Sequence, residues 1–180
     1  SKKGSSACLS CKTGYYSNGT LSDGETLREK CFECPKGYYN DKTREVNCKL
    51  CPVGWMSNGR SQDCSACKQG QYGAKNLMED PIISCKECPA GYKQELSKMN
   101  FCNSCNEGRY SLSGRSACTR CPAGWSAKKG FGNGTCHICP AGYKSSSESS
   151  TCSVCLAGFA AIEQSSECDQ CNQGKYQNIS

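Results

Sequence analysis

The hydrophobic residues other than cysteine are sparse along this chain and follow no helical period. Between its glycines and prolines the chain runs through Ser, Lys, Glu and Thr, without the apolar spacing of three and four that an amphipathic helix requires. Aromatic residues instead recur one or two places after a glycine, where short strands can begin. The pattern predicts short strands joined by tight turns, with almost no helix.

These aromatic positions belong to a motif that occurs ten times. Each copy begins at the second cysteine of a C-x-x-C pair and has a glycine three places later, followed by the aromatic residue. The glycines are Gly14, Gly37, Gly54, Gly70, Gly91, Gly108, Gly124, Gly142, Gly158 and Gly174. Proline often follows the pair directly; it fixes φ while glycine permits positive φ, so C-P-x-G predicts a tight turn into a strand. The aromatic ring can then lie over a neighbouring disulfide.

The spacing of the pairs predicts a tandem array of small hairpin and loop modules. Gaps between pairs run 19, 13, 12, then 17, 13, 12, then 14, 12, 12 residues, so each group of three opens with its longest loop. We expect an elongated array over residues 1–180 with a superperiod of about 54 residues, counted from these gaps. Its groups are 8–66, 67–120 and 121–170, and residues 171–180 open a further module.

Composition explains what stabilises such an array. The hydrophobic share is 36%, but 20 of those residues are cysteines, so a continuous apolar core is excluded. Oxidised structural cysteines are the expected substitute, because disulfides stabilise small extracellular modules that lack a core. In the chain-entropy model, a ring of 15 residues is worth about 3 kcal/mol. We therefore predict a small disulfide-rich fold.

Spacing alone leaves two disulfide connectivities open. In an interlocked scheme, alternate pairs join as Cys8 with Cys31 and Cys11 with Cys34, and so on. In a ladder, the second cysteine of each pair joins the first of the next, which we favour because the turn motif then lies inside each ring. The ladder consists of Cys11–Cys31, Cys34–Cys48, Cys51–Cys64, Cys67–Cys85, Cys88–Cys102, Cys105–Cys118, Cys121–Cys136, Cys139–Cys152 and Cys155–Cys168.

The ladder leaves Cys171 and Cys8 over. Joining the end of the sequence to its beginning places 16 residues between them, within the observed range of gaps. We therefore expect that copies of the chain continue head to tail, either as a repeat within one polypeptide or as separate protomers. Cys171–Cys8 is then the candidate bond between copies.

Zinc and redox chemistry are the alternatives for paired cysteines. Zinc ribbons also use C-x-x-C pairs, but five separate tetrahedra would be needed here, and His137 is the single histidine. A thioredoxin-like site uses one C-x-x-C on a βαβ scaffold, which this chain lacks. We expect His137 to be a surface residue and predict no metal, no cofactor and no catalytic residue.

The runs "CPAGYKSSSESSTCSVC" and "CPVGWMSNGRSQDCSAC" resemble the cysteine-rich repeats called ephrin-receptor-like. They are also similar to the first sub-module of tumour-necrosis-factor-receptor cysteine-rich domains. That resemblance implies bonds Cys34–Cys48, Cys51–Cys64, Cys88–Cys102, Cys121–Cys136 and Cys139–Cys152. It implies an extracellular disulfide-rich rod and is uninformative about a partner. The five modules without proline, at Cys11, Cys67, Cys105, Cys155 and Cys171, match its pattern less closely.

Surface chemistry points to covalent sugar. Asn18, Asn133 and Asn178 each begin an N-x-S/T sequon and lie in long loops, so we predict N-glycosylation at all three. The run 144–153 is rich in serine and is interpreted either as a site of O-linked sugar or as a solvated turn. The net charge of +6 comes from interspersed Lys and Arg, and this argues against nucleic acid as a partner. No window is apolar enough for a membrane span.

Two hypotheses for function follow, both extracellular. The first is a non-catalytic structural glycoprotein, a repeat unit of a filament, hair or surface coat whose partners are copies of itself. The second is the ligand-binding cysteine-rich ectodomain of a cell-surface receptor, with an apolar patch in loop 68–84. That patch would consist of Leu77, Met78, Pro81, Ile82 and Ile83. The acidic pair Glu79 and Asp80 beside it is interpreted as part of a solvated loop.

Overall fold

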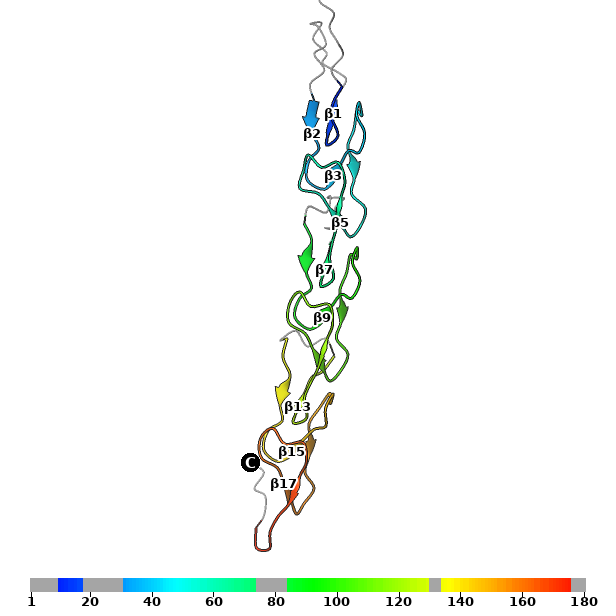
Figure 1. Cartoon of the computed structure of the whole chain (residues 1–180). Coiled ribbons are helices and arrows are strands. Elements are labelled where there is room, and N and C mark those ends of the chain that lie inside the picture. The colour runs from blue at the N-terminus through cyan, green and yellow to red at the C-terminus, as the bar shows by residue number, and fades with distance from the viewer. Residues whose placement is uncertain (1–9, 18–30, 74–83, 130–133, 176–180) are drawn as a thin grey trace, which may run out of the picture. The chain divides into compact units, whose positions relative to one another are not determined.

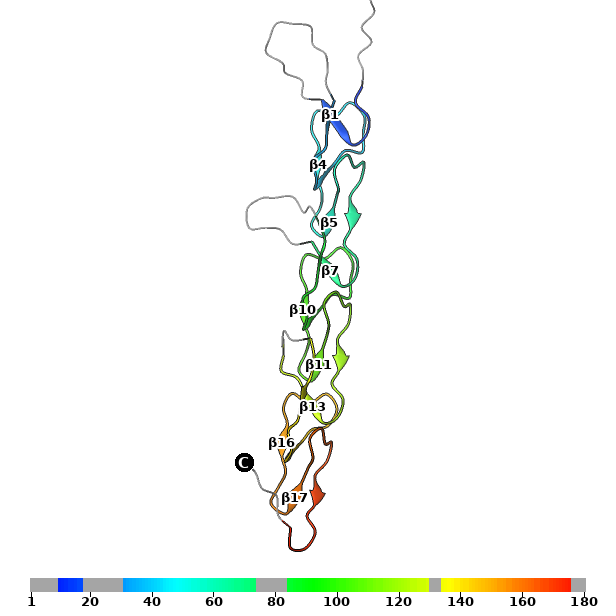
Figure 2. The same ribbon diagram turned by 90° about the vertical axis from the view of Figure 1, so that its left-hand side faces the viewer.

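The computed structural model describes residues 10–17, 31–73, 84–129 and 134–175. In these ranges eighteen short strands form nine two-stranded sheets, and no helix occurs (Figures 1 and 2). The strands are β1 (Tyr15–Ser17), β2 (Cys31–Glu33), β3 (Tyr38–Tyr39), β4 (Lys49–Leu50), β5 (Trp55–Met56), β6 (Ser65–Ala66), β7 (Gln71–Tyr72), β8 (Lys86–Glu87), β9 (Tyr92–Lys93), β10 (Asn103–Ser104), β11 (Arg109–Tyr110), β12 (Thr119–Arg120), β13 (Trp125–Ser126), β14 (His137–Ile138), β15 (Tyr143–Lys144), β16 (Ser153–Val154), β17 (Phe159–Ala160) and β18 (Asp169–Gln170).

Each sheet is a minimal hairpin that the turn motif begins. In the hairpin of β15 and β16, Gly142 has φ 84° and the Tyr143 N–H donates to the Pro140 carbonyl at 3.1 Å. The chain then extends through Tyr143, returns, and pairs antiparallel with the two residues inside the next C-x-x-C, so that Tyr143 lies opposite Val154. The predicted fold of tandem disulfide-rich hairpins without helix is confirmed.

Nine disulfides close these hairpins. They join the second cysteine of each pair to the first of the next, with Cα–Cα distances of 5.5 to 5.8 Å. This is the order of the ladder, from Cys11–Cys31 through Cys155–Cys168. Hairpins are named below by their disulfides.

The buried interior contains no large aliphatic side chain in the described residues. Its buried apolar members are ten cysteines together with Ala127 and Ala161, whereas Leu96, Leu112 and Ile162 are exposed. Disulfides with aromatic rings against them take the place of a core. At Cys121–Cys136, the rings of Tyr110 and Trp125 pack on the buried cluster, as the motif predicted.

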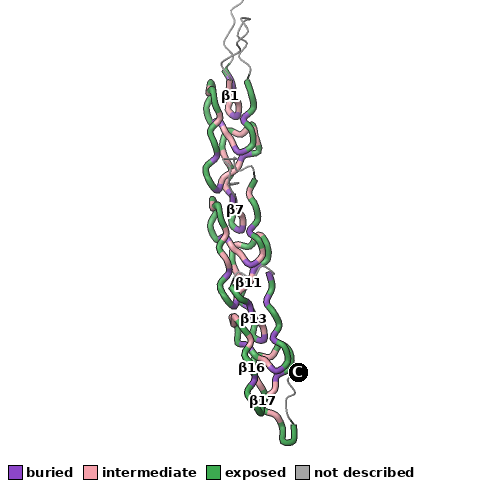
Figure 3. The backbone as a smooth tube through the Cα atoms, turned by 180° about the vertical axis from the view of Figure 1, so that it is seen from behind, coloured by how far each residue is buried: buried purple, intermediate pink, exposed green. Residues whose placement is uncertain are grey.

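The chain divides into two units. The first consists of Ser1–Lys68, Tyr72–Lys86 and Lys98–Asn100, and the second of Gln69–Gln71, Glu87–Ser97 and Phe101–Ser180. Within the second unit, successive hairpins follow one another, and buried residues recur along the tube at each of them (Figure 3). Each unit therefore consists of small repeated interiors in place of one central core.

Candidate functional site: the contacts between successive hairpins

At seven of the motif glycines, a hydrogen bond from the glycine N–H joins one hairpin to the next. The Gly124 N–H donates at 2.9 Å to the carbonyl of Ser145, which is the third residue after the glycine of the following hairpin. We call this residue the G+3 residue. The same bond joins Gly14 to Asn40, Gly37 to Ser57, Gly70 to Gln94, Gly91 to Ser111, Gly108 to Ala127 and Gly142 to Ala161. The turn therefore both shapes its own hairpin and binds the next.

Four G+3 side chains bond back to the preceding hairpin. The hydroxyl of Ser145 donates to the carbonyl of Trp125 at 2.9 Å, although Ser145 is only 4% exposed. Equivalent bonds run from Asn40 to Tyr15 at 2.6 Å, from Ser57 to Tyr38 at 2.7 Å and from Ser111 to Tyr92 at 2.8 Å. These buried polar residues were missed in the sequence, although their constant offset from glycine was a readable signal.

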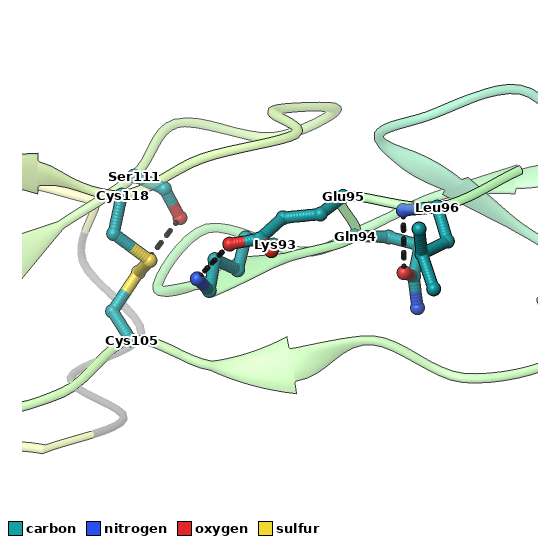
Figure 4. A network of polar contacts seen from close by, with 7 residues as sticks. All are labelled: Lys93, Gln94, Glu95, Leu96, Cys105, Ser111 and Cys118. Carbon is teal, nitrogen blue, oxygen red and sulfur yellow. Dashed lines mark hydrogen bonds and ion pairs between the residues drawn. A yellow bond between two sulfur atoms is a disulfide. The ribbon is translucent and has the colours of Figure 1, made fainter.

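Gln94 is a fully buried G+3 residue with a different pattern (Figure 4). Its amide nitrogen donates to the carbonyl of Phe101 at 2.6 Å, and its amide oxygen accepts from the Leu96 N–H at 3.0 Å. Ser111 in the next hairpin has its hydroxyl 3.4 Å from the sulfur of Cys105. Both buried side chains are thus satisfied, which avoids the cost of an unpaired polar group.

In six of the hairpins, a second turn within the described residues supplies another hydrogen bond. A residue there has positive φ, and its N–H donates to the carbonyl of the cysteine that opens the preceding hairpin, at 2.8 to 3.2 Å. We call it the left-handed residue. The six cases are Arg44 to Cys11, Arg60 to Cys34, Lys98 to Cys67, Gly114 to Cys88, Glu148 to Cys121 and Gln164 to Cys139. Five of these residues carry side chains, so their left-handed backbone was not expected from the sequence.

The left-handed residue also reaches the hairpin two places earlier. Its carbonyl lies so close to the motif glycine there that a Cβ on the glycine would overlap the oxygen. The pairs are Gly14 with Arg60, Gly54 with Lys98, Gly70 with Gly114, Gly108 with Glu148 and Gly124 with Gln164. Glycine is thus required twice at these positions, once for positive φ and once for the close approach of another backbone.

Charged and aromatic side chains accompany these backbone contacts. Glu148 pairs with Arg109 at 2.6 Å and with Arg120 at 3.0 Å. The Lys98 ammonium lies 4.9 Å from the centre of the Trp55 ring. Such exposed contacts add little stability, but they differ from hairpin to hairpin and so favour one register of stacking.

The ion pair of Arg60 with Glu33 is another of these register contacts. The Arg60 guanidinium donates a hydrogen bond to the Glu33 carboxylate, and this bond raises the pKa of Arg60 above its ordinary value. Arg60 lies in the Cys51–Cys64 hairpin, and Glu33 is the last residue of β2. Glu33 directly precedes Cys34, where the preceding hairpin begins.

The Cys155–Cys168 hairpin presents the same surface uncovered. Gly158 and Gly174 have positive φ of 83° and 78°, yet both are exposed, and no atom of the described residues lies within 4 Å of the position a Cβ would take. Leu156 and Ile162 nearby in the sequence are 76% and 80% exposed. Cys171, next along the chain, is a free, half-buried thiol.

Several residues singled out in the sequence lie outside the described residues. They are Cys8, the sequon residues Asn18, Asn133 and Asn178, the acidic pair Glu79 and Asp80, and the apolar set Leu77, Met78, Pro81, Ile82 and Ile83. His137 lies exposed on β14. In the serine-rich run, Ser145 is buried and the hydroxyl of Ser147 donates to the carbonyl of Cys121, so part of this segment is a contact surface.

One cavity of about 280 Å³ opens beside the Cys121–Cys136 disulfide. Its described lining consists of Tyr110, Pro122, Trp125, Thr135 and Cys136 and is mostly apolar. That lining includes no carboxylate, histidine or lysine, the groups most used for acid–base catalysis. Nowhere in the described ranges do three metal-binding side chains gather, and no helix there could cross a membrane.

Ladder-closed hairpins with repeated glycine contacts define a tandem cysteine-rich repeat. Residues 19–56 match the family described as tyrosine-protein kinase ephrin type A/B receptor-like. The resemblance to ephrin-receptor-like cysteine-rich repeats is therefore confirmed. The similarity to tumour-necrosis-factor-receptor modules stays a prediction.

Relatives with other domain compositions share the repeat. The chain is 30% identical over 123 residues to Sushi, von Willebrand factor type A, EGF and pentraxin domain-containing protein 1 of Rattus norvegicus, covering 63% of the chain and 3% of that protein. It is 26% identical over 157 residues to Signal peptide, CUB and EGF-like domain-containing protein 2 of Mus musculus, covering 73% and 15%.

Receptors are among the relatives too. Identity to Ephrin type-B receptor 3 of Xenopus laevis is 36% over 76 residues, covering 42% of the chain and 7% of the receptor. The chain thus spans at most 15% of the length of each of these three relatives. In the matched regions it resembles extracellular cysteine-rich modules of receptors and of EGF- and CUB-containing proteins.

Proposed function

We propose that this chain is a non-catalytic extracellular structural glycoprotein, a repeat unit of a filament, hair or surface coat. One observation carries the proposal: the described hairpins bind their neighbours through main-chain contacts that recur at successive glycines. Such stacking extends by adding identical units, and the stability of an array of this kind is approximately a sum over neighbouring contacts. This geometry suits spacing and display better than chemistry in a pocket.

The proposed partners are copies of the chain arranged head to tail. A bond between Cys171 of one copy and Cys8 of the next would continue the ladder, and the free thiol of Cys171 supports this assignment. The groups 8–66, 67–120 and 121–170 would then recur along the filament. N-glycans at Asn18 and Asn133 would project from the first modules of the groups 8–66 and 121–170, and one at Asn178 from the further module that begins at residue 171. No metal or cofactor is involved.

Imaging and peptide mapping test this function together. In negative stain, the purified chain should form regular fibres that lengthen with concentration. Non-reducing peptide mapping of those fibres should recover the nine ladder bonds and a Cys171–Cys8 peptide, with glycan on the sequon asparagines. Particles of one chain at every concentration would contradict the filament.

The receptor ectodomain is the second candidate, favoured by the similarity to Ephrin type-B receptor 3. Its ligand would bind loop 68–84, whose apolar residues give a recognition patch. Replacing Ile82 and Ile83 with serine should then abolish capture of a soluble protein by the monomeric chain. The same replacement should leave fibres unaffected if the structural function is correct.

A further inference from the structure

The Cys155–Cys168 hairpin has the backbone of a covered hairpin without its cover. The carbonyl of Gly158 accepts from the Cys171 N–H at 2.8 Å, as that of Gly124 accepts from Cys139 at 2.9 Å. Their φ values, 83° and 81°, are nearly equal. Gly124, however, lies buried against the carbonyl of Gln164, two hairpins on, while Gly158 faces open space. Gly124 and Gly158 therefore have the same backbone conformation and differ in whether another hairpin covers them.

Apolar side chains surround Gly158 in the sequence. Leu156 is 76% exposed, Phe159 39% and Ile162 80%, so the Cys155–Cys168 hairpin carries three exposed apolar side chains. Val154, 50% exposed, lies on β16 of the preceding hairpin. Gly174 in the next turn is exposed in the same way. The two uncovered glycines, with these apolar groups near them in the sequence, are the candidate docking surface.

Arg44 is the complementary feature at the other end of the described chain. It has φ 68°, and its N–H donates to the carbonyl of Cys11. The other left-handed residues donate in the same way to the cysteine that opens the preceding hairpin. Those five each place a carbonyl against a glycine two hairpins earlier. For Arg44, that glycine would belong to a hairpin preceding Cys11.

We propose that Gly158 and Gly174 form a docking surface for a second copy of this chain, in which the carbonyl of that copy's Arg44 lies against Gly174. The inference rests on the proposed function, and it names the surface through which copies join. Continuity with the internal contacts identifies the occupant, because the same glycine conformation and the same left-handed turn recur on the two sides. A head-to-tail contact joins two different surfaces, and it generates an open filament when the rotation between copies does not close a ring.

Asparagine at either glycine tests the docking surface. Asparagine tolerates positive φ, and its side chain would occupy the space needed by the incoming carbonyl. Sedimentation velocity over a range of concentrations should show wild-type oligomers that grow with concentration. Gly158→Asn and Gly174→Asn should associate at least about tenfold more weakly, a loss of about 1.4 kcal/mol, because the new side chain overpacks a close contact. Ala157→Asn, at an exposed neighbour of Gly158, should associate like wild type.

The outcomes separate this inference from the proposed function. Wild-type assembly that persists unchanged in Gly158→Asn and Gly174→Asn would overturn the docking surface and leave the filament standing. A wild-type chain that never assembles would remove the filament itself. A fusion of two copies head to tail tests the contact without relying on association between free chains. Amide exchange over residues 156–162 of the first copy should be slower in this fusion than in the single chain. Equal exchange rates would overturn the inference.

Discussion

The Cys121–Cys136 and Cys155–Cys168 hairpins share one backbone design in different surroundings. Each begins with a glycine of positive φ, an aromatic residue on a two-residue strand and a partner strand inside the next C-x-x-C. In the first hairpin the glycine is buried under Gln164, and in the second it is exposed. The comparison separates what a hairpin needs for its own turn from what it needs for its neighbours.

Removing a disulfide should have the largest effect, and a larger one in the covered hairpin. Alanine at both Cys121 and Cys136 should destabilise the local structure by about 3 kcal/mol for the ring alone. It also removes the packing of Tyr110 and Trp125 on a buried disulfide. Alanine at Cys155 and Cys168 should lower the stability by little more than the contribution of the disulfide-closed loop. Amide exchange of the two hairpins measures the difference, and equal losses would mean that the aromatic packing contributes nothing.

The motif glycines provide a matched pair for the stacking contact. Gly124→Ala and Gly158→Ala both place a side chain at positive φ, which costs about 1 to 2 kcal/mol. At Gly124 the new methyl also overlaps the Gln164 carbonyl, so about 1 to 3 kcal/mol more is expected there. Denaturant unfolding of the two variants isolates this extra cost. If Gly158→Ala proved as destabilising as Gly124→Ala in dilute solution, the close approach would not be the reason for glycine.

The buried G+3 residues should give a smaller effect. Ser145→Ala leaves the carbonyl of Trp125 without its donor and should cost about 1 kcal/mol. Ala161 holds the equivalent place one hairpin later and is 9% exposed. Ala161→Ser can donate to the carbonyl of Tyr143, so its melting temperature should stay equal or rise. A strong loss of stability in Ala161→Ser would show that the bond is peculiar to Ser145.

The smallest effect is expected at a fully exposed pair within one hairpin. Lys49 donates to Asp41 at 2.6 Å, and this hydrogen bond lowers the pKa of Asp41 below its ordinary value of 3.8. A lowered carboxylate pKa contributes stability above the ordinary value and loses it as the pH falls through the folded pKa. Lys49→Met should therefore raise the Asp41 pKa in an NMR titration while stability at neutral pH barely changes. An unmoved Asp41 pKa would remove Lys49 as the cause.

Local signals in the sequence identified the hairpin fold well. Glycine three places after each pair, followed by an aromatic residue, predicted the turn and the first strand because both depend on the backbone preferences of adjacent residues. The second turn was harder, since Arg44, Lys98 and Gln164 adopt a conformation that side-chain residues rarely take. Their residue types do not predict positive φ, because hydrogen bonds to the preceding hairpin hold this conformation.

The surface through which successive hairpins contact one another was not evident in the sequence. Ser145 sits in a run of serines that reads as polar and solvated, yet its hydroxyl is buried against Trp125 of another hairpin. A serine hydroxyl can bond equally well to water or to a carbonyl. Its environment therefore depends on how the hairpins stack, which the residue type does not reveal. The constant offset of three residues from the motif glycine marks the position of Ser145, but it does not identify the Trp125 carbonyl as the group that Ser145 contacts.

By itself, the sequence determined the C-x-x-C turns, the aromatic strands, the absence of a helical pattern and the reliance on cysteine, because each follows from the chemistry of residues near one another in the chain. Tertiary structure decided which glycines are covered, which polar groups are buried and which residues are forced to positive φ. Those properties arise when the backbones of hairpins one and two places apart meet, and no local pattern specifies the distance between them.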